Sequence, residues 1–153
     1  MAFNTDKPTT VGFSIENSTN HEHITAFYPR ELSMETFGMI SQDIALIVKE
    51  IENPVYVSIC GLDNFGPNKD IPVYRVKFQE KSYEKMFVDL WWRYDDSDER
   101  RNGLHDPEWH ITIKKGGSVN FYKDSPVQPL IRLDSIFMKH LGPHDPYAKF
   151  DLP

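Results

Sequence analysis

Two stretches of this chain repeat apolar residues at the three- and four-residue spacing of a helix, and short segments rich in β-branched and aromatic residues surround them. The first stretch covers residues 33–51 and stops before Asn53-Pro54, and the second covers residues 82–94. Each apolar stripe occupies one side of its helix, which is typical of a helix packed on a sheet, so both stripes are interpreted as core. The residues available as N-caps are Ser33 or Thr36 for the first helix and Ser82 for the second.

The segments outside the two helices predict short strands separated by turns, because apolar and polar residues alternate within them. The predicted strands cover residues 11–15, 23–27, 55–59, 73–78, 111–113, 119–122 and 130–138, with turns at 61–72 and 114–117. The Asp-rich tract at 95–99 predicts a solvated loop. The resulting order β, β, α, β, β, α, β, β, β is that of an α+β domain with one helix in each half.

Size and charge limit the classes of function. The chain has 153 residues, which is the size of one compact domain spanning 1–153. Its formal net charge of −6 and pI of about 5.5 argue against binding to long nucleic acid or to an anionic membrane, because both need a basic face. A small ligand or a protein partner is favoured instead.

Cysteine usage and hydropathy predict the compartment. The lone Cys60 excludes a disulfide scaffold and a zinc site built from several thiols, and it fits a reducing compartment. The opening MAFNTDKPTT lacks the apolar run of a signal peptide, and no stretch approaches the roughly 18 apolar residues of a membrane span. The sequence therefore predicts a soluble, cytoplasmic protein.

The tripeptide His-Ile-Thr occurs at His23 and again, 87 residues later, at His110. Residues two apart in a strand share a face, so His23 projects beside Thr25, and His110 beside Thr112, while the Ile between them points into a core. An imidazole exchanges protons near neutral pH, and a Thr hydroxyl hydrogen-bonds phosphate oxygens. Two such pairs on one groove would supply a general base, a general acid and two hydroxyls around one phosphorus.

These motifs and their surroundings resemble the 2H phosphoesterase superfamily, the LigT-like enzymes named for two His-x-Thr/Ser motifs. His23-Ile-Thr-Ala, followed by the helix at 33–51, is similar to the first motif region, and Asp106-Pro-Glu-Trp-His110-Ile-Thr-Ile, preceded by the helix at 82–94, is similar to the second. Between them, Gly61-Leu-Asp-Asn-Phe65 and Pro72-Val-Tyr-Arg-Val resemble the family's central strand, turn and strand. The resemblance implies a bilobal α+β fold in which two pseudo-symmetric β/α lobes, with antiparallel sheets inside and helices outside, line a central groove. The 22 residues before His23 depart from the family pattern.

The resemblance also implies a function. Enzymes of this family act without metal or other cofactor on phosphodiesters next to a ribose hydroxyl, opening a 2′,3′-cyclic phosphate or splitting a 2′-5′ or 3′-5′ linkage. Carried over to this chain, one of His23 and His110 is the base and the other the acid, while Thr25 and Thr112 hold the phosphoryl oxygens. The expected protein is a hydrolase, a phosphodiesterase with a small nucleotide or short oligonucleotide as partner, and a monomer is expected. The hypothesis for its role is a viral or phage protein that degrades 2′-5′ oligoadenylate or a cyclic oligonucleotide messenger of host immunity, in the host cytoplasm.

Further residues are predicted to contact the substrate, namely Phe27, Trp109, Lys114 and Tyr122. Lys114 shares the face of Thr112 if its strand continues, and it would pair with phosphate. Phe27 would bound the groove or stack on a base, while Trp109 and Tyr122 are candidate stacking residues. Residues 109–149 carry six Lys and Arg against three Asp and Glu, so this stretch would attract a small anion.

Three other interpretations remain open. A metal site would combine His21, His23 and His110 with His105-Asp106, or with His140 and His144, although the next Glu after His23 lies eight residues on, too far for a cupin-like pattern. A degenerate family member would hold a nucleotide without cleaving it. A cyclic phosphodiesterase that processes RNA ends, such as those of tRNA splicing, is the third.

Overall fold

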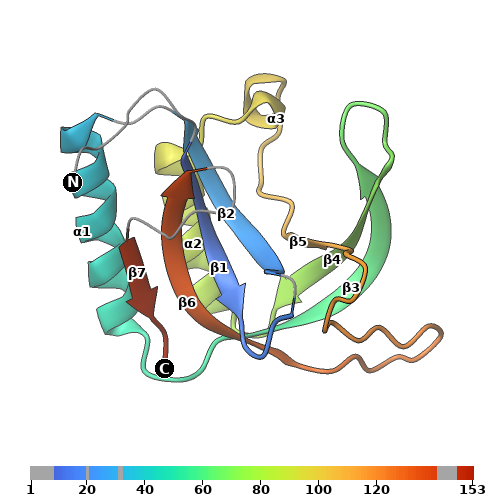
Figure 1. The fold of residues 1–153 in the computed structure, drawn as a ribbon. Helices are drawn as coiled ribbons and strands as arrows, with labels where there is room; N and C mark the ends of the chain where they lie inside the picture. Colours follow the sequence, from blue (N-terminus) through green and yellow to red (C-terminus); the bar gives the residue numbers. More distant parts are fainter. Residues whose placement is uncertain (1–8, 20, 31–32, 141–147) are drawn as a thin grey trace.

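The computed structural model describes residues 9–19, 21–30, 33–140 and 148–153. Within these ranges the chain is an α+β structure with one seven-stranded antiparallel sheet, as the sequence predicts for the fold class (Figure 1). The elements are β1 (Thr9–Ile15), β2 (His23–Arg30), α1 (Met34–Glu50), β3 (Tyr56–Phe65), β4 (Ile71–Phe78), α2 (Lys81–Tyr94), α3 (Asp98–Arg101), β5 (His110–Thr112), β6 (Ile131–His140) and β7 (Ala148–Asp151). No helix among the described residues is long and apolar enough to cross a membrane.

The strand pairings close on themselves. The order is β1-β2-β5-β4-β3-β6-β7, and β6 also pairs with β1. Strand β6 joins β3 through its first residues, Ile131 and Arg132, and runs along β1 and β7 through the remainder. The two ends of the sheet are thereby tied together, which fixes β2 and β5 in the middle of a continuous hydrogen-bonded surface.

The main core lies between the sheet and the two long helices. In Figure 1, α2 runs behind the sheet and α1 lies beside β7. Aromatic rings meet edge to face in this core, with Phe13 centred 4.7 Å from Phe87 and 5.8 Å from Phe78. The apolar stripes predicted from the sequence supply the helix side, including Ile40 and Ile44 of α1 and Phe87 of α2. The opposite face of β2 and β5 is left for polar side chains.

Both predicted helices form, with one difference at a cap. Ser33 caps α1, since its side chain accepts a hydrogen bond from the Thr36 amide. The second helix is capped by Glu80 and not by the predicted Ser82. The Glu80 carboxylate accepts from both the amide and the hydroxyl of Ser82, which therefore lies inside the first turn.

Beyond shifts of one to three residues at strand ends, the strands differ from the sequence prediction in three places. Strand β3 continues to Phe65, so the predicted turn at 61–72 shrinks to the hairpin tip between β3 and β4. Residues 119–122 form no strand, because their polar groups bond locally: the Tyr122 amide donates to the Gln128 side chain. Strand β7 is absent from the sequence prediction, and it adds to the edge of β6.

Candidate active site

The two His-Ile-Thr segments are neighbours in the sheet. Strands β2 and β5 pair antiparallel through Ile24 and Ile111, both fully buried. This register sets His23 opposite Thr112 and His110 opposite Thr25, and all four side chains are partly exposed on the face away from Ile24 and Ile111. Diagonal neighbours in such a pair lie about 7–8 Å apart, so both imidazoles can flank one phosphorus. The four residues that the sequence selects are thus brought together about a local two-fold relation.

Both imidazoles form the same hydrogen bond. His23 Nδ1 lies 3.2 Å from the carbonyl oxygen of His21, and His110 Nδ1 lies 2.7 Å from that of Glu108. A carbonyl oxygen can only accept, so Nδ1 is the donor in each bond. The neutral ring then keeps its Nε2 lone pair for the substrate, and each histidine is oriented by the backbone two residues before it.

The surroundings of His23 lower its pKa below the ordinary value of 6.5. Burial is the largest cause, because it penalises the charged imidazolium, and the charges of Lys139, Lys114 and His110 act in the same direction, against the bond to His21. His23 is therefore neutral at neutral pH. A neutral imidazole with a free Nε2 is the form that a general base requires.

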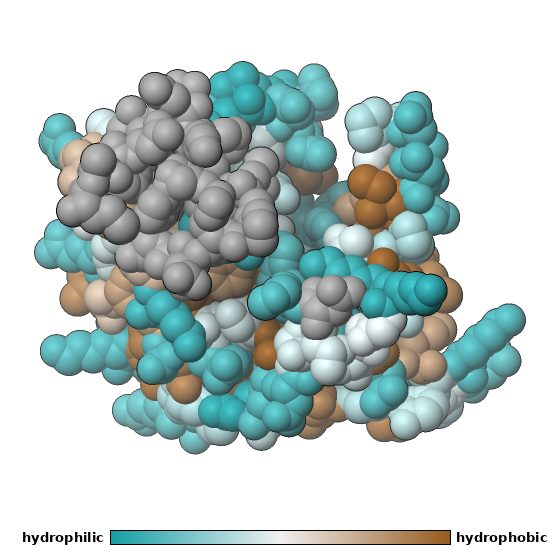
Figure 2. Space-filling view, viewed as in Figure 1, coloured by the Kyte–Doolittle hydropathy of each residue, from teal (hydrophilic) through white to brown (hydrophobic). Residues whose placement is uncertain are grey.

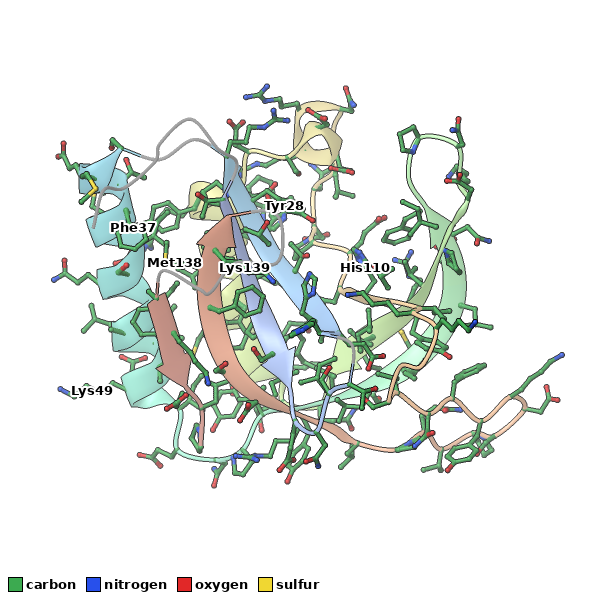
Figure 3. The ribbon with its side chains drawn as sticks, in the orientation of Figure 1. Tyr28, Phe37, Lys49, His110, Met138 and Lys139 are labelled. Atoms are coloured by element: carbon green, nitrogen blue, oxygen red, sulfur yellow. The ribbon has the colours of Figure 1, made fainter. Side chains whose placement is uncertain are left out.

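Each histidine also contacts an aromatic ring, and the two settings differ. The Phe137 ring meets His23 edge to face at 5.9 Å, and it fills the space above Gly12, where a Cβ would approach Phe137 Cζ to 2.7 Å. The Phe65 ring lies 4.5 Å from the His110 ring. Figure 2 shows a notch between the β3–β4 hairpin and the segment that carries α3, and His110 lies below it in the same view (Figure 3).

A β-bulge in β2 changes which residue follows Thr25 on this face. Gly12 of β1 pairs with Thr25 while the preceding Val11 pairs with Phe27, so Ala26 is an extra residue in β2. The alternation is inverted beyond it: Phe27 is 1% exposed and stacks on Tyr94 in the core. The prediction that Phe27 lines the groove is therefore wrong. Tyr28 takes that place, with its hydroxyl 3.4 Å from Thr25 Oγ1.

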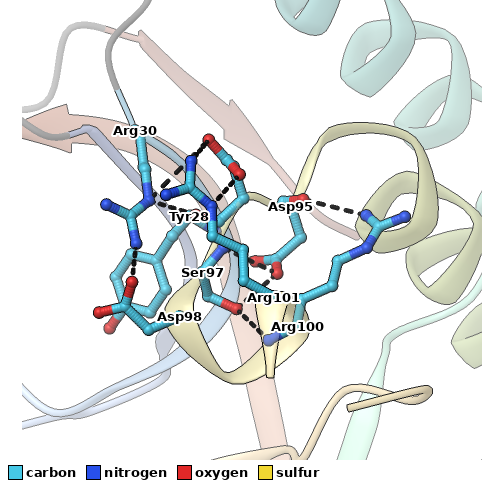
Figure 4. Close-up of polar contacts among 8 residues, drawn as sticks. Tyr28, Arg30, Asp95, Ser97, Asp98, Arg100 and Arg101 are labelled. Carbon is cyan, nitrogen blue, oxygen red and sulfur yellow. Dashed lines mark hydrogen bonds and ion pairs between the residues drawn. The ribbon is translucent and has the colours of Figure 1, made fainter. Parts of the chain in front are cut away.

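The segment after α2 holds Tyr28 in position (Figure 4). The Tyr28 amide donates to the Asp95 carboxylate over 2.8 Å, and the Tyr28 carbonyl accepts from the Asp96 amide over 2.7 Å. Asp95 is buried and also accepts from the Ser97 hydroxyl, while Arg30 binds Asp96 and Asp98. The Asp-rich tract thus holds β2 in place through hydrogen bonds and ion pairs, and it is not the solvated loop that its composition suggests.

The other predicted contact residues fall into two groups. Trp109 is 6% exposed and packs on Phe13 and Phe78, with its Nε1 donating to Glu84 over 2.8 Å, so the prediction that it stacks on substrate is wrong. Tyr122 is 56% exposed in the loop before β6, and its contact with substrate stays a prediction. Lys114 lies beyond β5, which ends at Thr112, and its Nζ donates to the His21 carbonyl over 3.3 Å; its contact with phosphate stays a prediction.

One residue that the motif analysis missed is Glu22, directly before His23. Its carboxylate is 4% exposed and accepts from the amide and hydroxyl of Ser118, over 2.7 and 2.8 Å. This contact joins the residue before β2 to the loop that follows β5. A charged residue just before a strand, two positions from the buried Ile24 and so in phase with its core side, is the sequence signal that marks it.

The metal interpretation finds no support in the geometry of the described residues, because no group of three or more His, Cys, Asp and Glu side chains among them is placed to hold an ion. His144 lies outside the described residues, as does the side chain of His140. No protein-family model matches the sequence, and a search of curated proteins finds no match either.

Proposed function

We propose that the chain is a metal-independent phosphodiesterase of the 2H type, which cleaves a phosphodiester next to a ribose hydroxyl in a small nucleotide or oligonucleotide. The observation that carries this proposal is the two-fold relation of the motifs, with His23 opposite Thr112 and His110 opposite Thr25 on paired strands. In this assignment the β1–β2 side and the β4–β5 side are the two lobes of the family fold.

The lowered pKa of His23 supports its role as the base, which leaves His110 as the acid. His23, neutral through its lowered pKa, removes a proton from the attacking hydroxyl or water by way of Nε2. As the new P–O bond forms, the P–O bond to the leaving ribose oxygen breaks, and His110, as the general acid, gives that oxygen a proton. The hydroxyls of Thr25 and Thr112 donate to the non-bridging oxygens, where negative charge builds. The two histidines exchange roles in the reverse direction.

The test is turnover of a substrate panel by matched variants. The panel holds 2′,3′-cyclic mononucleotides, 2′-5′ oligoadenylates, and cyclic di- and trinucleotides, with EDTA present. His23→Gln and His110→Gln each remove one proton-transfer group and are expected to lower kcat by about 10²–10⁴-fold. The control is His105→Gln, the same change at an exposed residue outside the strands.

The outcomes separate the rival functions. Near wild-type turnover in either active-site variant contradicts acid–base catalysis by that pair. If the wild-type chain binds a nucleotide from the panel and releases no product, the chain is a non-catalytic nucleotide-binding module. Cleavage confined to 2′,3′-cyclic ends of RNA supports the RNA-processing role over the signalling one.

A further inference from the structure

The face that carries the histidines is symmetric only at its centre. On the β4 side, Arg75 lies over the Phe65 ring and is paired with Asp63 at 2.8 Å, so its charge is neutralised. On the β6 side, Lys139 follows Phe137 by two residues, and Thr10 and Gly12 of β1 face them in register. Because residues two apart share a face, Lys139 and Phe137 lie on the side of the sheet that presents Thr25, the partner of Gly12.

The ammonium group of Lys139 is held near the site. Its Nζ lies 5.1 Å from the centre of the Phe137 ring, which in turn meets the ring of His23. Among the described residues, no carboxylate forms an ion pair with Lys139. Figure 3 shows Lys139, Tyr28 and His110 across the same face. A half-buried cation of this kind is an anion-binding group.

The backbone of Lys139 lies to one side of the place between β2 and β5 where the reacting phosphate would sit. Strand β6 is two strands from β2, or about 10 Å, while the scissile phosphorus lies between β2 and β5. A mononucleoside 2′,3′-cyclic phosphate has one phosphate, so once it is seated between the histidines it has no anion left for Lys139. A chain of two or more phosphodiesters has one.

We propose that Lys139, seated on Phe137, binds a second phosphate of the substrate, so that the preferred substrate is an oligonucleotide, linear or cyclic, and not a mononucleoside cyclic phosphate. This inference rests on the proposed function and narrows its substrate class. In the substrate complex, the second phosphate would neutralise the positive charge of Lys139 near His23.

The test compares substrates that differ by one phosphate. These are the 2′-5′ diadenylate core and the same dimer phosphorylated at its 5′ end or at its terminal 2′ end. The wild-type enzyme is expected to cleave one phosphorylated dimer with a kcat/KM about tenfold or more above that of the core, which corresponds to one charge-assisted hydrogen bond. Lys139→Gln should abolish this preference, so that core and phosphorylated dimers are cleaved with equal kcat/KM.

The control is Lys49→Gln, the same loss of charge on α1 at the far side of the molecule (Figure 3). It should keep the preference. Equal kcat/KM for core and phosphorylated dimers in the wild-type enzyme overturns the inference, as does a preference that survives Lys139→Gln.

A binding measurement distinguishes this inference from the proposed function. Calorimetry uses the His110→Gln variant, in which the substrates stay intact, with and without Lys139→Gln. An increase in Kd that is about tenfold larger for a phosphorylated dimer than for the core supports the second-phosphate site even if the wild-type chain cleaves nothing. An unchanged Kd, or no measurable binding of any dimer, overturns it.

Discussion

Gly12→Ala tests whether the Phe137 ring is fixed against the site by contact. A Cβ at residue 12 would stand 2.7 Å from Phe137 Cζ and 3.0 Å from the backbone oxygen of Ile24. The first approach requires the ring to move, and the second meets a backbone atom that cannot rotate away. Overpacking of this kind costs about 1–3 kcal/mol, and two simultaneous close contacts place the expected cost at about 2–3 kcal/mol. For a chain of this length Tm should fall by about 5–10 °C.

The assay is thermal unfolding followed by circular dichroism, extended to a double-mutant cycle. Phe137→Leu removes the far end of the ring and lowers stability by itself. In this background Gly12→Ala should lower the free energy of unfolding by less than it does in wild type, so the two effects are not additive. Gly38→Ala is the control: at this exposed glycine of α1 nothing lies within 4 Å of the position that a Cβ would take, and the change should stabilise by about 0.5–1 kcal/mol. Additive effects, or a Gly12→Ala Tm within about 1 °C of wild type, would refute the reasoning.

Three more predictions concern protonation and packing. The pKa of His23 in the folded state lies below the value of 6.5 in the unfolded state, so on acidification the imidazole is protonated first in the unfolded state. The contribution of His23 to the free energy of unfolding is therefore fully present above pH 6.5 and is lost as the pH falls toward the folded pKa. Tm should therefore decline more between about pH 7.5 and 5.5 in wild type than in His23→Gln, and an NMR titration of His23 at or above 6.5 contradicts this. Trp109→Phe leaves Glu84 without its indole donor and opens a gap in the core. The free energy of unfolding, measured in urea, should fall by about 1–3 kcal/mol while KM is unchanged. A raised KM with unchanged stability would instead support the predicted stacking of Trp109 on substrate. Asp95→Ala removes the acceptor of the Tyr28 amide hydrogen bond. Hydrogen exchange should show that this amide loses protection, and the free energy of unfolding should fall by about 2–3 kcal/mol. Unchanged protection would mean that the segment after α2 does not hold β2 in place.

The helices, most strands and the centre of the site follow from local patterns. The side chains of His23 and Thr25 share a face in any regular strand, whatever that strand pairs with, so the sequence is sufficient to group them. The same holds for His110 and Thr112. That the two pairs are adjacent depends on the order of strands in the sheet, which the sequence pattern leaves open; the family resemblance implies only that both pairs face one groove.

What the sequence could not provide depends on long-range partners. The bulge at Ala26 arises from the fit of β2 to β1, and it exchanges Phe27 for Tyr28 on the site face. The burial of Trp109 depends on a carboxylate from α2 that is 25 residues away. Residues 119–122 have strand character, but no strand in the described part of the chain pairs with them.

The closed circuit of strands has a consequence for the kinetics of folding. Phe13 of β1 pairs with Ile136 of β6, 123 residues further along the chain, and the motif strands must close a loop of similar order before His23 meets Thr112. Pairings between residues so distant in sequence lose much chain entropy before they gain contacts, and folds dominated by them assemble in milliseconds to seconds. The two helices can form early from local contacts, whereas the pairing of β2 with β5, which brings the two His-Ile-Thr segments together, has no local precursor. Refolding should therefore restore helical circular dichroism before it restores hydrogen-exchange protection of the β2–β5 pairing at Ile24 and Ile111.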